Sequence, residues 1–207
     1  KQMMLEAKQR YENNPNAEDE KLVARYHNMQ MAKKIQLNSA YGALANQYFR
    51  WFSFDLAESI TMSGQLSIRW IEKKINLYMN KLLKTNNVDY VIASDTDSIY
   101  VEMKNLVSEA FLGDEHDELK IVSVIDQFCE QKIQPEFKKE MELLATAMGC
   151  VENKILFKRE AIASTGMFIA KKRYALLVQD LEGVRFTEPK LKIMGLETAR
   201  SSTPAVV

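Results

Sequence analysis

The sequence has few cysteines, histidines, glycines and prolines, and it has no long apolar run. Cys129 and Cys150 form neither a CxxC pair nor a disulfide framework, so we expect reduced thiols in an intracellular protein. Two histidines are too few for a His-rich zinc site. Seven glycines and four prolines exclude collagen-like and low-complexity chains. No uncharged apolar run approaches the roughly 18 residues that cross a bilayer, so we expect no membrane partner.

The chain does have enough apolar residues for a packed core, because 46% of its 207 residues are hydrophobic and 9% are aromatic. That length fits one large domain or two small ones. The first residues, KQMMLEAKQRYE, contain no apolar signal-peptide core, and they show a helical pattern without an N-cap. We therefore expect a cytoplasmic protein whose sequence here begins inside an element.

The net charge is zero, but the charges are unevenly distributed. Residues 21–84 carry ten Lys and Arg against three acids, residues 85–153 carry five against fifteen, and residues 154–200 carry ten against five. Two basic segments around an acidic one suit a surface that grips a polyanion around a site that holds cations. A hydrated acidic loop and helix face would give the same counts, so that alternative stays open.

The apolar spacing predicts an order of helices, a hairpin, a further helix and antiparallel strands. Helices are predicted over residues 1–10, 20–47, 56–83 and 117–148. Strands are predicted over residues 88–93, 98–103, 155–162, 173–179 and 184–186. Because no βαβ alternation and no internal repeat are present, the predicted fold class is α+β.

The first candidate site is the acidic tip of the predicted hairpin, where Asp95 and Asp97 flank one threonine. Two carboxylates this close repel each other unless a cation lies between them, and oxygen ligands suit Mg²⁺. An EF-hand loop also begins with DxD, but Tyr100 stands where that loop needs Gly and Leu106 where it needs Glu. A hydrated acidic turn is the remaining alternative.

The second candidate site is a helical stripe. Lys34, Asn38 and Tyr41 are spaced at i, i+4 and i+7, which places them on one face of a helix. A cation, an amide and a phenol in that order can meet a phosphate, an oxygen-rich group and a base or sugar. Gly42 costs a helix about 1 kcal/mol relative to Ala, which is reasonable if a ligand approaches the backbone there. An ordinary solvated helix face is the alternative.

The third candidate site is the run Lys171-Lys172-Arg173-Tyr174, which opens a predicted strand. Strand alternation predicts Lys172 and Tyr174 on one face and Lys171 and Arg173 on the other. Cations beside an aromatic on a sheet are typical of nucleic-acid surfaces. A basic strand edge that deters aggregation would have the same sequence.

Each motif alone is a weak signal, but the three in this order and spacing are a specific one. NSAYG after a helical lysine, DTDS between two strands, and then KKRY resemble the family B DNA polymerases across nearly the whole chain. The tail LEGVRFTEPKLKIMGLETARSSTP is most similar to the replicative polymerases of T-even-type bacteriophages. The resemblance implies a palm, with an antiparallel β-sheet packed on helices, and long antiparallel fingers helices. It assigns fingers helices and the fingers-to-palm helix to residues 1–50, palm to 51–200 and the start of a thumb to 201–207.

The resemblance also implies roles in nucleotide binding. Lys34 and Asn38 match residues that contact the incoming dNTP, and Lys1 looks like another triphosphate-binding lysine of the fingers. Tyr41 matches a residue that lies against the nascent base pair. Gly42 closes the same motif, beside the DNA.

Metal and primer binding are implied in the same way. Asp97 matches the family's metal ligand, Asp95 lies nearby and is less directly involved, and Glu160 resembles an acid near the second of two Mg²⁺ ions. The run Lys171–Tyr174 matches the residues that hold the primer end of a primer-template DNA. We expect a sliding clamp to bind regions of the parent protein outside this chain.

Two departures from the family pattern stand out. Ala93-Ser94 replaces the Tyr-Gly that usually precedes DTDS, and nothing matches the other carboxylate motif, DxxSLYP. We therefore expect a piece of a polymerase that is inactive alone.

Two other functions remain as alternatives. A reverse transcriptase or RNA polymerase palm also carries paired acids at a hairpin tip, although NSAYG and KKRY argue against it. A non-catalytic RNA-recognition-like module would need alternating strand aromatics that are absent here.

Overall fold

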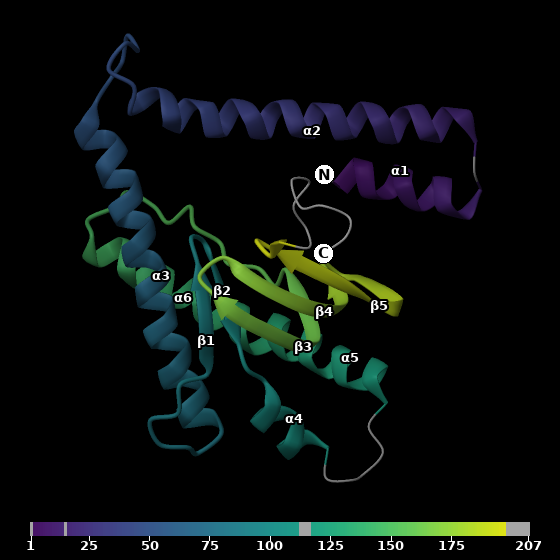
Figure 1. The fold of residues 1–207 in the computed structure, drawn as a ribbon. Helices are drawn as coiled ribbons and strands as arrows, with labels where there is room; N and C mark the ends of the chain where they lie inside the picture. Colours follow the sequence, from purple (N-terminus) through teal and green to yellow (C-terminus); the bar gives the residue numbers. More distant parts are fainter. Residues whose placement is uncertain (1, 15, 112–116, 198–207) are drawn as a thin grey trace. The chain divides into compact units, whose positions relative to one another are not determined.

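The computed structural model describes residues 2–14, 16–111 and 117–197. The chain divides into two compact units, Lys1–Ser63 and Gly64–Val207. Helices combined with two antiparallel sheets confirm the α+β class (Figure 1). The expected start of a thumb lies outside the described residues, and the expected fingers and palm boundaries stay predictions.

The first unit begins with a helical hairpin, α1 (Gln2–Asn13) and α2 (Ala17–Leu44), whose helices run antiparallel in Figure 1. Helix α2 starts earlier than predicted because Asn16 caps it. The Asn16 side-chain oxygen accepts hydrogen bonds from the backbone N–H groups of Glu18 at 3.1 Å and Asp19 at 2.7 Å. These bonds satisfy amides that have no partner inside the helix.

The core of the second unit forms between three helices and a hairpin. Helix α3 (Phe54–Leu82) begins in the first unit, and its later half presents apolar side chains every four residues. These side chains pack against α5 (Glu118–Phe128) and α6 (Gln134–Ala147). The buried cluster consists of Ile71, Ile75, Met79, Leu83, Tyr90, Val91, Cys129, Ile133, Phe137, Met141 and Leu144.

Helices α5 and α6 are joined without a break by a π-helical turn, Cys129–Ile133, so the single helix predicted over 117–148 is confirmed over its described part. Pro135 follows this turn and has no N–H to donate. The N–H of Gln134 bonds to the carbonyl of Cys129, five residues earlier. This wider turn fits a helix around a proline. The short helix α4 (Lys104–Ala110) was not predicted.

The hairpin that carries DTDS consists of β1 (Val91–Asp95) and β2 (Ser98–Val101). Its first strand begins three residues later than predicted, because side chains of α3 bind the backbone before it. The Asn80 amide oxygen accepts from Val88 N–H at 2.9 Å, and the Asn76 amide oxygen accepts from Tyr90 N–H at 2.8 Å. Helix α3 therefore fixes where the hairpin starts.

A second, three-stranded antiparallel sheet has the order β3 (Ala161–Ala170), β4 (Arg173–Leu181) and β5 (Val184–Met194). The strand predicted over 155–162 was wrong: residues 154–160 are irregular, and the strand runs over Ala161–Ala170 instead. Strand β5 was predicted to end at Phe186 but continues to Met194, because it pairs with β4 along most of its length.

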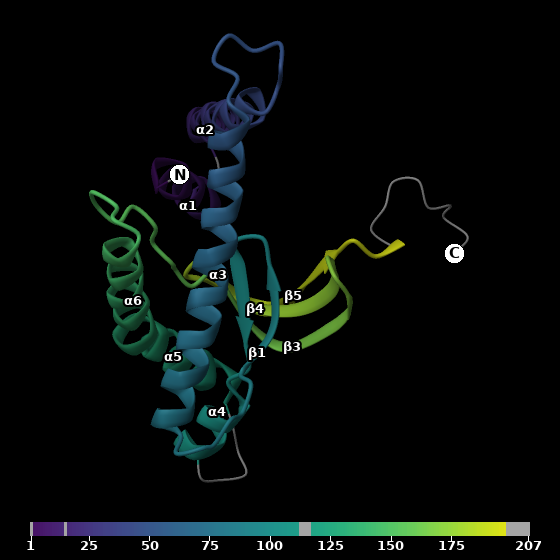
Figure 2. The ribbon, with the colours of Figure 1, turned by 90° about the vertical axis from the view of Figure 1, so that its left-hand side faces the viewer.

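Within the second unit, the hairpin lies between the helical core of α3, α5 and α6 and the three-stranded sheet (Figure 2). Side chains alternate along β2, so Ile99 packs on the helical core while Tyr100 packs on the sheet. None of the helices in the described part of the chain is long and apolar enough to cross a membrane.

Candidate functional site

The stripe Lys34, Asn38 and Tyr41 lies on α2, as predicted. Every residue of α2 is described, and none of them is buried. The three side chains are exposed, and a Cβ added to Gly42 would meet no atom within 4 Å. The helix therefore presents a cation, an amide and a phenol to solvent, with an open backbone beside them. Lys1 lies outside the described residues.

The DTDS hairpin turns tightly at its acidic tip. Asp95 pairs with Ser98 at the end of the ladder, and only Thr96 and Asp97 lie between them. The Asp97 N–H donates to the Asp95 carbonyl at 2.7 Å, with Thr96 at φ 55°. A β-branched residue rarely adopts this left-handed conformation, so the tip is a tightly constrained turn.

The two aspartates of the tip have different surroundings. The Asp95 carboxylate accepts from the Thr96 hydroxyl at 3.0 Å and lies 3.9 Å from the ammonium of Lys172. Asp97 is more exposed, and no hydrogen bond or ion pair joins its carboxylate to another described residue. The Asp97 carboxylate is thus free to accept a ligand contact, whereas the Asp95 carboxylate already lies beside the Lys172 ammonium.

The first half of the KKRY run lies in a turn and not in the strand. Lys171 and Lys172 form the turn between β3 and β4, and only Arg173 and Tyr174 belong to the strand. The prediction that alternation sets the faces of both lysines was therefore wrong. Lys172 has φ 62°, and a Cβ on Gly195 would lie 2.1 Å from its carbonyl oxygen. Glycine is needed where the segment after β5 supports this turn.

Tyr174 is 6% exposed, and its ring lies under the DTDS hairpin. The Tyr100 hydroxyl donates to the Tyr174 hydroxyl at 2.8 Å, and their ring centroids are 5.4 Å apart. Phe168 of β3 completes an aromatic trio, 5.1 Å from the Tyr100 centroid and 5.5 Å from that of Tyr174. Burial and the bond to Tyr174 raise the pKa of Tyr100 to about 12. This phenol therefore stays protonated.

A cavity of about 370 Å³ lies between β1 and the turn that carries the two lysines. Asp95, Tyr100, Lys172 and Tyr174 all line it, together with Ala93-Ser94. These two residues are the point where the sequence departs from the Tyr-Gly pattern. The DTDS and KKRY motifs, more than 70 residues apart in sequence, thus share one concave surface.

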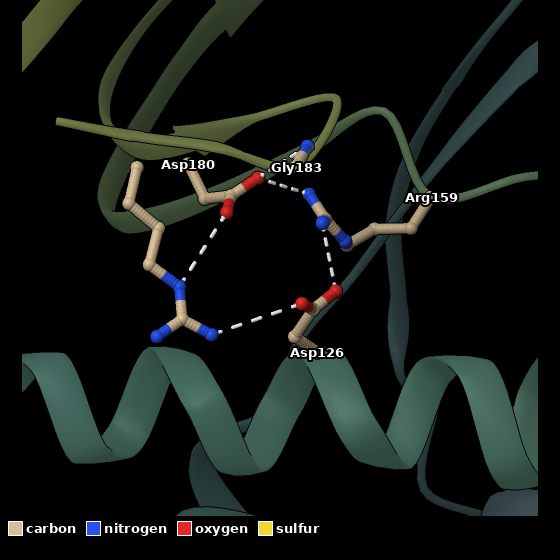
Figure 3. Close-up of polar contacts among 5 residues, drawn as sticks. Asp126, Arg159, Asp180 and Gly183 are labelled. Atoms are coloured by element: carbon tan, nitrogen blue, oxygen red, sulfur yellow. Dashed lines mark hydrogen bonds and ion pairs between the residues drawn. The ribbon is translucent and has the colours of Figure 1, made fainter.

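Glu160 lies just before β3, next to a buried ion network (Figure 3). The Arg159 guanidinium bonds to the carboxylates of Asp126 on α5 and Asp180 on β4, and Asp180 also accepts from the Gly183 N–H at 2.9 Å. Arg185 lies 3.8 Å from both carboxylates. This network ties the helix, the sheet and the segment with Glu160 together.

Charge and burial act in opposite directions on Arg159. Burial alone would lower its pKa, but the hydrogen bond and charge of Asp180, with those of Asp126, outweigh burial and raise it. The guanidinium is therefore fixed as a cation. Its partner Asp180 has no solvent exposure, so loss of either side chain would remove the nearest counter-charge of the other.

Glu160 and Asp97 line the same groove, of about 1040 Å³, beside β2. Glu160 Oε1 accepts from the Lys192 ammonium at 3.0 Å, and the Glu160 carbonyl accepts from the Glu182 N–H at 2.6 Å. A hydrogen bond therefore fixes the backbone of Glu160, while its exposed carboxylate forms an ion pair with Lys192.

The donors present suit a hard divalent cation, because all three expected ligands, Asp95, Asp97 and Glu160, offer carboxylate oxygens. Among the described residues, no three acidic, histidine or cysteine side chains gather closely enough to hold a metal ion. Of the three, Asp97 is the one whose carboxylate has no hydrogen bond or ion pair to another described residue, whereas Asp95 and Glu160 each lie beside a lysine.

Comparison with known proteins places these motifs in a family. The model of DNA polymerase family B matches residues 2–140, which include the α2 stripe and the DTDS hairpin. The chain belongs to DNA polymerase family B. The resemblance noted for its motifs is thereby confirmed.

Two relatives of this polymerase chain come from T-even-type bacteriophages. The DNA-directed DNA polymerase of Enterobacteria phage T4 is 40% identical over 92% of the chain, and that of Escherichia phage RB69 is 38% identical over 86%. A DNA polymerase beta of African swine fever virus is 30% identical over 56% of the chain. The chain spans 22% of the T4 protein and 21% of the RB69 protein.

Sequence reasoning missed three features of this polymerase segment: the Tyr100 hydrogen bond, Gly195 under the Lys172 turn, and the network around Arg159. Gly195, which follows a strand, is a weak sequence signal for a turn. This signal does not predict that Gly195 contacts Lys172. The Arg159 and Tyr100 contacts join segments that lie far apart in the sequence, so no local pattern marks them.

Proposed function

We propose that the chain is the fingers-and-palm portion of a template-directed DNA polymerase, which transfers a deoxynucleotide from a dNTP to a primer 3′-OH. The first unit supplies fingers helices and the second unit supplies palm. The T4 and RB69 relatives, named as DNA-directed DNA polymerases, support this function. The parent protein acts on primer-template DNA in the cytoplasm of a host cell and binds a sliding clamp through regions outside this chain.

The observation that carries the proposal is the convergence of two kinds of side chain in the second unit. Asp97 and Glu160 line one groove, and Asp95, two residues before Asp97, lines the adjoining cavity with Lys172, whose ammonium lies 3.9 Å from its carboxylate. Carboxylates hold the cations that phosphoryl transfer needs, and lysines bind DNA phosphates. One DNA end at this surface would meet both.

Each motif has a separate task in the proposed reaction. Two Mg²⁺ ions, when bound, would promote attack by the 3′-OH and stabilise charge on the leaving oxygens. Asp97 is the ligand that this chain offers them. Lys34 balances the charge of the triphosphate as it increases, and Asn38 and Tyr41 orient the nucleotide on the same helical stripe. The KKRY turn holds the primer end.

The chain alone lacks DxxSLYP, the other carboxylate motif of the family, so it offers only part of the proposed metal site. We therefore expect the isolated chain to incorporate no nucleotides. Activity should therefore be measured in a full-length polymerase that contains this segment.

The α2 stripe provides a direct test with a matched control. Lys34→Ala should raise the apparent dissociation constant for dNTP and lower the incorporation rate, because the lost charge acts most strongly in the transition state. Lys33→Ala removes the same charge about 100° around the helix and should change either constant less than twofold. Equal effects of the two substitutions, measured by single-turnover primer extension, would refute nucleotide binding by this stripe.

A further inference from the structure

The DTDS hairpin and the KKRY strand belong to different sheets. Among the described strands, β1 and β2 form one sheet and β3, β4 and β5 form another. No ladder of backbone hydrogen bonds therefore sets the position of Asp97 relative to Lys172. Side-chain contacts do this: the packing of the hairpin on the helices, the ion network around Arg159, and contacts between the two sheets.

Among the described residues, two polar contacts join the DTDS hairpin to the KKRY segment. The first joins Lys172 and Asp95 at 3.9 Å, but the lysine side chain is 64% exposed. An exposed pair of this kind is screened by salt and contributes little to holding a geometry. It is also lost when the lysine turns to a DNA phosphate.

The second contact is the hydrogen bond from Tyr100 to Tyr174, at 2.8 Å. Tyr174 is buried, and both rings pack against Phe168. Burial raises the pKa of Tyr100, so its hydroxyl remains a donor at physiological pH. This bond persists in high salt and while Lys172 is engaged elsewhere.

We propose that Tyr100 is a positioning residue, which holds the KKRY strand against the DTDS hairpin through its hydrogen bond to Tyr174. The bond thereby fixes the primer end relative to Asp97. Tyr100 lies two residues after Ser98 of the motif, on the same short strand as the end of the acidic tip. A displacement of Tyr100 would therefore also displace the tip. This inference rests on the proposed polymerase function.

The test is Tyr100→Phe in a full-length polymerase that contains this segment. The substitution keeps the ring and its packing but leaves the buried Tyr174 hydroxyl without this partner. Reacting groups that are misplaced by a fraction of an ångström lose rate, so the single-turnover incorporation rate should fall about tenfold. The apparent dissociation constants for dNTP and for primer-template should change less than twofold, because Lys34 and the phosphate contacts are intact.

Tyr90→Phe is the matched control. Tyr90 is also buried in the second unit, and its hydroxyl bonds to the Thr85 hydroxyl at 2.8 Å, before the hairpin begins. Its loss removes the same kind of bond without touching either motif. We expect a comparable decrease in melting temperature and an incorporation rate within twofold of the wild type.

A double-mutant cycle separates positioning from independent damage. Tyr174→Phe should lower the incorporation rate by a similar factor, and the double variant should be no slower than the slower single variant. A rate for Tyr100→Phe equal to that of Tyr90→Phe, or additive losses in the double variant, would overturn the proposal. Failure of the polymerase function itself would differ, since Lys34→Ala and Lys33→Ala would then behave alike.

Discussion

Helix α2 and the second unit hold their candidate residues in opposite ways. Lys34, Asn38 and Tyr41 stand on a helix with no buried residue among its fully described positions, so the helical repeat alone sets their spacing. Asp97 and Lys172 are set by a packed core, a buried ion network and contacts between two sheets. Sequence spacing suffices to describe the first arrangement, whereas the second depends on contacts that are distant in sequence.

The buried ion network should give the largest loss of stability when broken. Asp180→Ala leaves the Arg159 guanidinium buried with one partner fewer, so the free energy of unfolding should fall by about 3–5 kcal/mol. Lys139→Ala, which removes an exposed pair with Glu136, should cost about 1 kcal/mol or less. Chemical denaturation followed by circular dichroism measures both. Equal costs would show that the network does not hold the second unit together.

The support under the Lys172 turn should have an intermediate effect. Gly195→Ala places a Cβ 2.1 Å from the Lys172 carbonyl oxygen at φ 65°, so the turn must move. We expect a loss of about 1–3 kcal/mol and faster dissociation of primer-template DNA.

Gly149→Ala is the control for that substitution. Gly149 has nearly the same φ, 68°, but open space around a Cβ, so its cost should be about 1 kcal/mol and its DNA dissociation unchanged. If both glycine variants released DNA at the same rate, the contact with Lys172 would have no role in holding the primer.

The smallest effect is expected on α2. Leu37 is 74% exposed, so Leu37→Ala removes almost no buried surface and replaces one good helix former with a better one. The free energy of unfolding should change by about 0.5 kcal/mol or less. A loss of about 2 kcal/mol or more, typical of a core leucine, would contradict the contrast between α2 and the second unit.

Local patterns predicted most helices and the hairpin but misplaced one strand. Residues 155–162 are rich in strand-forming side chains, yet Arg159 bonds to Asp126 and Asp180 there, and the segment pairs in no ladder until Ala161. Strand β3 itself contains small residues such as Gly166 and Ala170, and it forms because β4 pairs with it. Tertiary pairing outweighs the weak intrinsic preference of such a segment.

The candidate site shows the same limit. The helical repeat correctly predicted that Lys34, Asn38 and Tyr41 share a stripe, and the flanking strands predicted the acidic tip. The Tyr100 bond spans 74 residues, and Gly195 meets Lys172 only because β5 ends beside the β3–β4 turn. These contacts arise from the pairing of strands, so sequence spacing alone cannot predict them.

The most direct test of the account compares Asp97→Ala with Asp95→Ala in a full-length polymerase that contains this segment. Asp97 has an available carboxylate, whereas Asp95 is partly engaged with Lys172. Single-turnover primer extension with Mg²⁺ should show a loss on the order of 10³-fold or more for Asp97→Ala, because metal stabilisation of the transition state is lost. Asp95→Ala should keep residual activity. An inactive Asp95→Ala beside an Asp97→Ala with near-normal turnover would contradict the assignment of Asp97 as the metal ligand.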